Sequence, residues 1–221
     1  MKIGIICAVD TELNPFLSHI EDCRVSEKAM LTFYEGSIYG IEIVALYCGV
    51  GKTNAAIATQ ILIDTFEADI IINSGTAGGM NINLSLFDTV ICTEAVYHDV
   101  HEDILTGFHP KLSSIYFEAS KPLIEASKKA KSNAVYGRMV TGDKFITDDG
   151  RDEINSKLKP LTVDMETAAI AHVCYVNNIP YLAIRTITDT SEHSGTDTFE
   201  ENCPKASKIS KDIVLGILEQ L

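Results

Sequence analysis

The segment Arg185-Thr-Ile-Thr-Asp189 places two charged side chains where they could act together. Side chains alternate between the faces of a strand, so Arg185, Ile187 and Asp189 should project from the same face. A cation and a carboxylate near a strand end can form an ordinary surface salt bridge or take part in proton transfer. Arginine is scarce in this chain, which favours a functional pair. The only others are Arg24, Arg138 and Arg151.

Two glutamates stand where helices are expected to begin. Glu12 follows the possible capping residues Asp10 and Thr11, and Glu166 lies in Val163-Asp-Met-Glu-Thr-Ala-Ala169. An acid in a first helical turn also interacts favourably with the helix dipole, by a few tenths of a kcal/mol to about 1 kcal/mol. That structural explanation suffices for Glu166 taken alone.

Two glycine-rich segments follow predicted strands. Gly49-Val-Gly-Lys-Thr53 is similar to the tail of a phosphate-binding P-loop, but the full pattern needs a glycine where Leu46 stands. We therefore expect a tight strand-to-helix turn there. Ser74-Gly-Thr-Ala-Gly-Gly79 lacks the G-x-G-x-x-G spacing. It predicts a turn whose glycines adopt positive φ or let the backbone approach a flat heterocycle or sugar, with Thr76 offering a hydroxyl.

Histidines and cysteines predict no metal site. His98, His101 and His109 lie among acidic residues but form no helical i, i+4 pair, so a solvated acidic loop is expected. The six cysteines form no C-x-x-C motif, and several lie in apolar runs. Buried, reduced thiols are the prediction.

Buried strands alternate with helices along the chain, which predicts an α/β fold with a parallel or mixed sheet covered on both faces. Ligands bind beyond the carboxyl ends of strands in such folds, and the glycines and acids described above lie there. One compact domain, residues 1–221, is expected. A hairpin is predicted at Tyr39-Gly40. Strands are predicted at 3–8, 31–37, 41–47, 69–73, 90–96, 134–140 and 181–187, and helices at 54–66, 121–131, 166–176 and 206–220.

The overall charge argues against two classes of partner. The formal net charge is -13, so phosphate backbones and anionic membranes should be repelled, and we expect neither nucleic-acid nor membrane binding. The apolar run from Ile3 to Ala8 is too short for a signal peptide, and no run reaches membrane-spanning length. A cytoplasmic location is expected.

Taken together, these motifs resemble the nucleoside phosphorylase superfamily, and specifically the 5'-methylthioadenosine/S-adenosylhomocysteine nucleosidases. They recur in the family's order along nearly the whole chain. The resemblance implies a three-layer α/β/α sandwich with a central mixed β-sheet, a homodimer, a place in methionine salvage, and no metal or organic cofactor. The matching motifs are Lys2-Ile-Gly-Ile-Ile6 with Glu12, Gly49-Val-Gly-Lys52, Ile71-Ile-Asn-Ser-Gly-Thr-Ala-Gly-Gly79, Tyr97-His-Asp99, Thr141-Gly-Asp-Lys-Phe-Ile146, Val163-Asp-Met-Glu166 and Arg185-Thr-Ile-Thr-Asp189.

The resemblance also implies a role for each matching position. Asp189 protonates N7 of adenine, and Glu12 takes a proton from the attacking water. N-glycoside cleavage passes through an oxocarbenium-like sugar, so an acid at the leaving group and a base for water suit it. Arg185 should lower the pKa of Asp189, and we expect desolvation around bound adenine to outweigh it. The resemblance implies that the ribose hydroxyls are held by Glu166 and Met165, with Arg185 supporting the ribose and the acid. It implies that Phe145 stacks on adenine and that the backbone of Ile146 contacts the adenine edge. The pocket is expected to be lined also by Val50, Thr76 and Gly78.

The expected nucleophile is water. Phosphate-using relatives typically place an arginine just before the glycine-rich turn, because a guanidinium fork matches phosphate. Here that neighbourhood reads Asn73-Ser74-Gly75, with no cation. Two alternatives stay open: a phosphate-dependent purine nucleoside phosphorylase, and a nucleoside-binding protein of the same fold without catalysis.

The chain departs from the family after Tyr97-His-Asp99, where it reads Val100-His-Glu-Asp-Ile-Leu-Thr-Gly-Phe-His-Pro110. In the family this segment supplies an aromatic cover for the 5'-alkylthio group, partly from a neighbouring subunit. Phe108 is a candidate replacement, and Phe199 is a candidate for the wall that closes over the site. The departure leaves open the preference among 5'-methylthioadenosine, S-adenosylhomocysteine, 5'-deoxyadenosine and aminodeoxyfutalosine.

Overall fold

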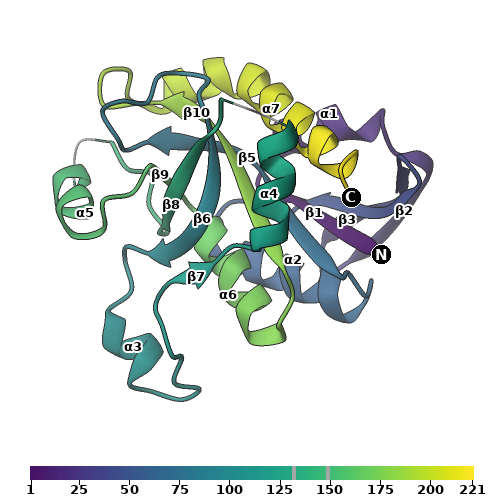
Figure 1. The fold of residues 1–221 in the computed structure, drawn as a ribbon, viewed down its shortest axis with the longest axis horizontal. Helices are drawn as coiled ribbons and strands as arrows, with labels where there is room; N and C mark the ends of the chain where they lie inside the picture. The colour runs from purple at the N-terminus through teal and green to yellow at the C-terminus, as the bar shows by residue number, and fades with distance from the viewer. Residues whose placement is uncertain (131–132, 148–149) are drawn as a thin grey trace.

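A ten-stranded mixed sheet runs through the molecule (Figure 1). The computed structural model describes residues 1–130, 133–147 and 150–221. Within these residues the strands lie in the order β10-β6-β8-β9-β5-β1-β4-β3-β2, and β7 pairs with β6. Their bounds are β1 (Lys2–Cys7), β2 (Glu21–Lys28), β3 (Leu31–Ile38), β4 (Ile41–Tyr47), β5 (Ile70–Gly79), β6 (Thr89–Tyr97), β7 (Phe117–Glu118), β8 (Val135–Thr141), β9 (Thr162–Asp164) and β10 (Tyr181–Asp189).

Helices cover both faces of this sheet. One layer contains α1 (Asp10–Leu17), α4 (Lys121–Ala130) and α7 (Thr196–Leu218), which pack against one another and against β5 and β10. The opposite layer contains α2 (Lys52–Asp64) and α6 (Thr167–Asn177), seen along the lower side of Figure 1. Two short helices, α3 (Glu102–Thr106) and α5 (Arg151–Leu158), lie at the periphery. This arrangement confirms the predicted α/β/α sandwich with a central mixed sheet.

Part of the sheet curls until it closes on itself. The first half of β5 lies between β1 and β10, whereas its last residues, Gly78 and Gly79, pair with β9. The strands β5, β10, β6, β8 and β9 therefore form a closed ring of pairings. The register of β10 against β5 shifts between Ile187 and Asp189, and such a bulge re-aims the side chain that follows it. As a result Asp189 lies opposite Gly78.

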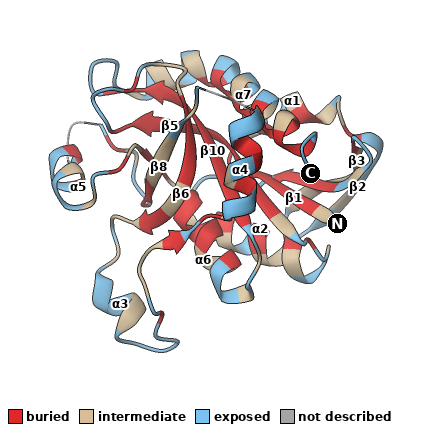
Figure 2. Cartoon of the chain, viewed as in Figure 1, coloured by how far each residue is buried: buried red, intermediate tan, exposed pale blue. Residues whose placement is uncertain are grey.

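The core explains why the apolar runs of the sequence are continuous. Ile3, Ile5 and Ile6 of β1 are fully buried, because helices cover both sides of this strand. Figure 2 shows the same burial along the central strands, with exposure on the outer helical faces, the connecting loops and the sheet edge. Five of the six cysteines are buried with free thiols, as predicted, and Cys23 is exposed. No helix among the described residues has the length and apolarity to cross a bilayer.

The predicted elements differ from the observed ones at informative places. The edge strand β2 was not predicted, because its exposed charged residues hide the alternating pattern. Helix α7 begins at Thr196 rather than Ala206; its first turns carry few apolar residues, and Pro204 lies inside it. The loop predicted around the histidines contains the short helix α3. The predicted helix end at Lys131 falls outside the described residues.

The largest correction concerns Ser74–Gly79, which is not a turn. Strand β5 continues through this segment to Gly79, and its residues are buried. Gly75, Gly78 and Gly79 do not have positive φ, so backbone conformation does not explain them. Neighbouring side chains do. A Cβ atom at Gly75 would lie 2.6 Å from Glu12 Oε1, and one at Gly78 would lie 3.0 Å from Asp189 Oδ2.

Candidate active site

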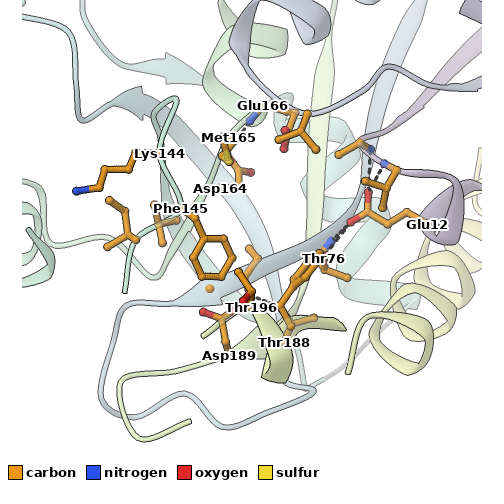
Figure 3. Close-up of a pocket in the computed structure, with 18 of the residues that line it drawn as sticks. Glu12, Thr76, Lys144, Phe145, Asp164, Met165, Glu166, Thr188, Asp189 and Thr196 are labelled. Carbon is orange, nitrogen blue, oxygen red and sulfur yellow. Dashed lines mark hydrogen bonds between the residues drawn. The ribbon is translucent and has the colours of Figure 1, made fainter. Parts of the chain in front are cut away.

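A pocket of about 250 Å³ opens at the carboxyl ends of β1, β5, β9 and β10 (Figure 3), where the sequence predicted a ligand site. Its wall is completed by the turn after β4, the segment after β8, and the first turns of α7. Ten of the predicted site residues line it: Glu12, Val50, Thr76, Gly78, Phe145, Ile146, Met165, Glu166, Asp189 and Phe199.

Glu12 is held by hydrogen bonds at both carboxylate oxygens. Oε1 accepts from the backbone N–H and the hydroxyl of Thr76, each at 2.8 Å. Oε2 accepts from the N–H of Ala8 at 2.8 Å and of Val9 at 3.4 Å. A carboxylate oxygen accepts hydrogen bonds, and all four partners of Glu12 donate to it. The predicted cap at Asp10 or Thr11 is wrong: the N-cap of α1 is Val9.

Asp189 occupies a different environment on another side of the pocket (Figure 3). It is 2% exposed, and its Oδ1 accepts a 2.9 Å hydrogen bond from the hydroxyl of Thr188. Burial raises the pKa of Asp189, against smaller lowering effects of the Thr188 hydrogen bond and the Arg151 charge. A raised pKa suits a carboxyl to donating a proton, and Asp189 meets this condition.

Arg185 does not pair with Asp189. The prediction that their side chains project together from one face of the strand is therefore wrong. Its Nε donates to Asp164 Oδ2 at 2.9 Å, and its Nη2 donates to Asn73 Oδ1 at 2.8 Å. The bulge between Ile187 and Asp189 separates the two charges that strand alternation alone would place together. Arg151, not Arg185, is the cation that lowers the pKa of Asp189, and burial outweighs it; the expected effect of bound adenine stays a prediction.

Glu166 lies at the N-terminus of α6 and receives contacts from two directions. The backbone N–H of Gly51 donates to Oε1 at 2.9 Å, and Arg185 Nη2 lies 3.7 Å from Oε2. Burial raises the pKa of Glu166 to about 7, although Arg185 lowers it. Glu166 thus faces the pocket as a buried acceptor, backed by a guanidinium that is itself fully buried.

The turn Gly49–Lys52 takes the form predicted for it. Gly49 has φ 84° and Gly51 has φ 102°, conformations that favour glycine in a tight strand-to-helix connection. The turn points the N–H of Gly51 at Glu166 and places Val50 in the pocket wall. Its glycines therefore aim a backbone donor at a side chain instead of wrapping a phosphate.

Aromatic and apolar side chains form the remaining wall. The rings of Phe145 and Phe199 meet edge to face, with centroids 6.2 Å apart. Ile146 is buried beside Phe145, and Met165 lies next to Glu166 (Figure 3). Two flat rings at this spacing offer a stacking surface for a planar heterocycle.

Two predicted substrate-binding residues lie outside the wall. Arg185 is fully buried behind Glu166 and Asp164, so within one chain it acts on the pocket only through those carboxylates. Phe108 is 67% exposed on the segment that follows α3, which projects from the body of the molecule (Figure 1).

Asp164 is the functional residue that sequence reasoning missed. Its Oδ1 accepts from the Thr141 hydroxyl at 2.6 Å and from the Thr167 N–H at 3.1 Å, so it caps α6 while holding Arg185. The N-cap of α6 is Glu166, so Asp164 does not occupy the usual capping position and gave no clear signal in the sequence. The other lining residues not predicted are Ala8, Val9, Ala77, Lys144, Val163, Thr188, Thr196 and Glu200.

The described residues contain no group of three or more His, Cys, Asp or Glu side chains arranged to hold a metal ion.

Comparisons with known proteins agree over the full length of the chain. The family model of the phosphorylase superfamily matches residues 2–219. A 5'-methylthioadenosine/S-adenosylhomocysteine nucleosidase from Bacillus licheniformis is 36% identical, with 100% of both chains covered. A crystal structure of such a nucleosidase from Colwellia psychrerythraea, in complex with adenine, is 35% identical. It covers 100% of this chain and 96% of its own, with a TM-score of 0.92. Futalosine hydrolase from Helicobacter pylori is 26% identical, with 100% and 98% coverage and a TM-score of 0.92.

Proposed function

The chain belongs to the phosphorylase superfamily, and on that premise we propose that it is a purine nucleosidase acting on 5'-methylthioadenosine and S-adenosylhomocysteine. It hydrolyses the N-glycosidic bond and releases adenine and the 5'-thio-substituted ribose, a step of methionine salvage. Residues 1–221 act as one nucleosidase domain. One observation carries the proposal: a single pocket holds Asp189, a carboxyl whose pKa burial raises, and Glu12, a carboxyl that four hydrogen bonds hold in place.

The two carboxyl groups divide the chemistry between them. Adenine stacks on Phe145 with its edge toward the backbone of Ile146, and Asp189 gives its proton to N7. The N-glycosidic bond then breaks with its electron pair moving into adenine, which leaves an oxocarbenium-like ribose. The oxygen of a water attacks C1' as Glu12 takes one of the water's protons. Acid and base of this kind each contribute typically 10²–10⁴-fold.

The ribose lies between these two groups. Glu166 accepts hydrogen bonds from its hydroxyls, and Met165 packs beside it. The Gly51 N–H and Arg185 already hold the Glu166 carboxylate, so it needs no reorganisation when the sugar binds. Val50 and Phe199 cover the apolar 5' side, which suits a methylthio group.

The charge of the pocket favours water over phosphate as the nucleophile. Besides the proton donor Asp189, the lining residues include Glu12, Asp164 and Glu166, and negative charge on these three would repel a phosphate dianion. Lys144 is the only lysine or arginine among the described lining residues, and its ammonium points away from the other labelled side chains (Figure 3). Arg185 donates hydrogen bonds to Asp164 and Asn73 and forms an ion pair with Glu166, so its guanidinium is already occupied.

Adenine release from 5'-methylthioadenosine, measured with and without added phosphate, tests the proposal. We expect equal rates, with 5-methylthioribose and no sugar phosphate as the second product. Asp189→Asn should lower kcat by about 10²-fold or more, because it removes the acid. A requirement for phosphate would show a phosphorylase instead. Binding without cleavage over hours would show a nucleoside-binding protein.

The same assay on four substrates addresses the 5' group. The panel is 5'-methylthioadenosine, S-adenosylhomocysteine, 5'-deoxyadenosine and aminodeoxyfutalosine. Our proposal expects the two thio-substituted nucleosides to have the highest kcat/KM. Preference for aminodeoxyfutalosine would instead place the chain nearer to futalosine hydrolase in function.

A homodimer is part of the proposal. Exposed apolar side chains occur on the layer of α2 and α6, namely Ile57, Tyr175 and Val176, and on the segment of α3, where Ile104 and Phe108 are exposed. Burying these side chains against a second copy would bring Phe108 toward the partner's pocket as a cover for the 5' group. Light scattering coupled to gel filtration measures the mass. A monomer at assay concentrations would contradict the proposed homodimer.

The cytoplasm is the proposed location of the protein. Its six free thiols suit that reducing compartment.

A further inference from the structure

A compact ion cluster lies outside the pocket at the ends of three elements. The ammonium of Lys52 lies 2.7 Å from Asp99 Oδ2 and 3.6 Å from Asp143 Oδ2. Lys52 begins α2, Asp99 follows β6, and Asp143 follows β8. The lysine is the P-loop-like residue of the sequence, yet two carboxylates occupy its ammonium, so it does not serve as a phosphate ligand.

Backbone hydrogen bonds tie the three segments together at the same point. The N–H of Lys52 donates to Asp143 Oδ1 at 2.8 Å, and the N–H of Asp143 donates to Asp99 Oδ2 at 2.9 Å. A Cβ atom at Gly51 would lie 3.3 Å from Asp143 Oδ1, so the two turns are in close contact. The cluster therefore holds backbone, and not only side chains, at fixed distances.

Each of the two clamped turns carries a different part of the substrate site. The turn Gly49–Lys52 directs the Gly51 N–H to Glu166, the ribose acceptor, at 2.9 Å. The segment that begins at Asp143 continues directly into Phe145 and Ile146, the adenine wall. The contacts between Lys52 and Asp143 join these two segments directly, without passing through the substrate.

We infer that Lys52, through Asp99 and Asp143, is a positioning residue that sets the spacing between the ribose acceptor Glu166 and the adenine-binding segment 145–146. The inference rests on the proposed function. A nucleoside contacts both Glu166 and the segment 145–146, so its binding depends on the distance between them. Free adenine contacts only the segment 145–146, so its binding does not depend on that distance.

The surroundings of the cluster distinguish it from an ordinary surface ion pair. The Lys52 side chain is 20% exposed, and its ammonium lies 5.5 Å from the centroid of the Tyr97 ring. Burial raises the pKa of Asp99, but the hydrogen bonds from Lys52 and the Asp143 N–H outweigh it and lower that pKa below its usual value. Lys128 offers a matched contrast. It pairs with Glu125 at 2.6 Å and lies 5.9 Å from the Tyr136 ring, but this pair joins residues of one helix on an exposed face.

The test compares Lys52→Met with Lys128→Met in the full chain. The measurements are KM and kcat for 5'-methylthioadenosine, the inhibition constant of free adenine, and Tm. For Lys52→Met we expect KM to rise about tenfold or more. Residues of one salt-bridge network typically have interaction energies of about 0.5–3 kcal/mol, and a tenfold change corresponds to about 1.4 kcal/mol. The adenine inhibition constant should stay within about threefold. Lys52→Arg should raise KM less than Lys52→Met does, because arginine keeps the positive charge. Lys128→Met should leave both constants unchanged.

Three outcomes decide the inference. A KM for Lys52→Met no higher than that of Lys128→Met overturns it. An equal rise in KM and in the adenine inhibition constant, with a lower Tm, also overturns it, because that pattern shows general structural support. If the unaltered chain releases no adenine, the proposed function fails by itself. The dissociation constants of 5'-methylthioadenosine and of adenine, measured by calorimetry on the same variants, then replace KM and the inhibition constant. The inference is decided by the same comparison of Lys52→Met with Lys128→Met.

Discussion

Gly75→Ala tests the reason for the glycines in β5. Gly75 is buried and has no positive φ, so alanine meets no conformational penalty there. The obstacle is space. The new Cβ would lie 2.5 Å from Arg185 Nη1, 2.6 Å from Glu12 Oε1 and 2.7 Å from Glu12 Cδ. Both neighbours are charged groups held by several hydrogen bonds, and neither can turn away freely.

The size of the effect follows from these distances. An ordinary contact begins near 3.4 Å, so the Glu12 carboxylate has to move by about 0.8 Å. A misplacement of about 1 Å in a catalytic group can cost 10²-fold, and we expect kcat for adenine release to fall by about this factor. Overpacking costs about 1–3 kcal/mol, which in a chain of this size lowers Tm by roughly 2–12 °C.

Gly137→Ala is the matched control. Its Cβ would also lie 2.5 Å from a neighbour, but that neighbour is Leu161 Cδ1, the tip of a flexible apolar side chain away from the pocket. We expect a smaller loss of Tm and an unchanged kcat. Initial rates of adenine release and thermal unfolding of the three proteins provide the data. If Gly75→Ala keeps kcat within about threefold of the unaltered chain, the close-approach explanation is refuted.

Two further predictions follow from the raised pKa values. Arg151 lowers the pKa of Asp189, so Arg151→Met should raise it, and the alkaline limb of the kcat profile should move to higher pH; Arg151→Lys keeps the charge and should leave the limb in place. The same limb in Arg151→Met as in the unaltered chain would contradict this. Folded Glu166, with a pKa of about 7, binds protons that the unfolded chain releases near its ordinary value of about 4.3, so the free energy of unfolding should fall as pH rises through this window. Urea unfolding at several pH values should show a flatter dependence for Glu166→Gln, and an unchanged slope would argue against the raised pKa.

Local patterns in the sequence were sufficient for most of the fold. The run Ile3–Ala8 is predicted as a strand covered on both sides because burial on both faces leaves no polar alternation. The hairpin at Tyr39–Gly40 is signalled by the glycine, which accepts positive φ. Ten of the twelve predicted site residues line one pocket, and nine of these ten belong to the ordered motifs. Periodicity and turn chemistry act over a few residues, so a single chain displays them directly.

Other features depend on which residues lie opposite one another, and only the tertiary structure decides that. The glycines of β5 were predicted to form a turn, because glycine is common both in turns and where side chains approach the backbone closely. The reason for glycine at these positions is seen only in the structure, where Glu12 and Asp189 lie against them. The bulge in β10 separates Arg185 from Asp189, and the closure of the sheet turns the guanidinium toward Asp164 and Asn73. The sequence by itself predicted most of the elements, the motifs and two carboxyl residues of the pocket, Glu12 and Asp189. Tertiary packing decided the partner of each charge, because long-range pairing depends on strand register and sheet closure, which neighbouring residues along the chain do not encode.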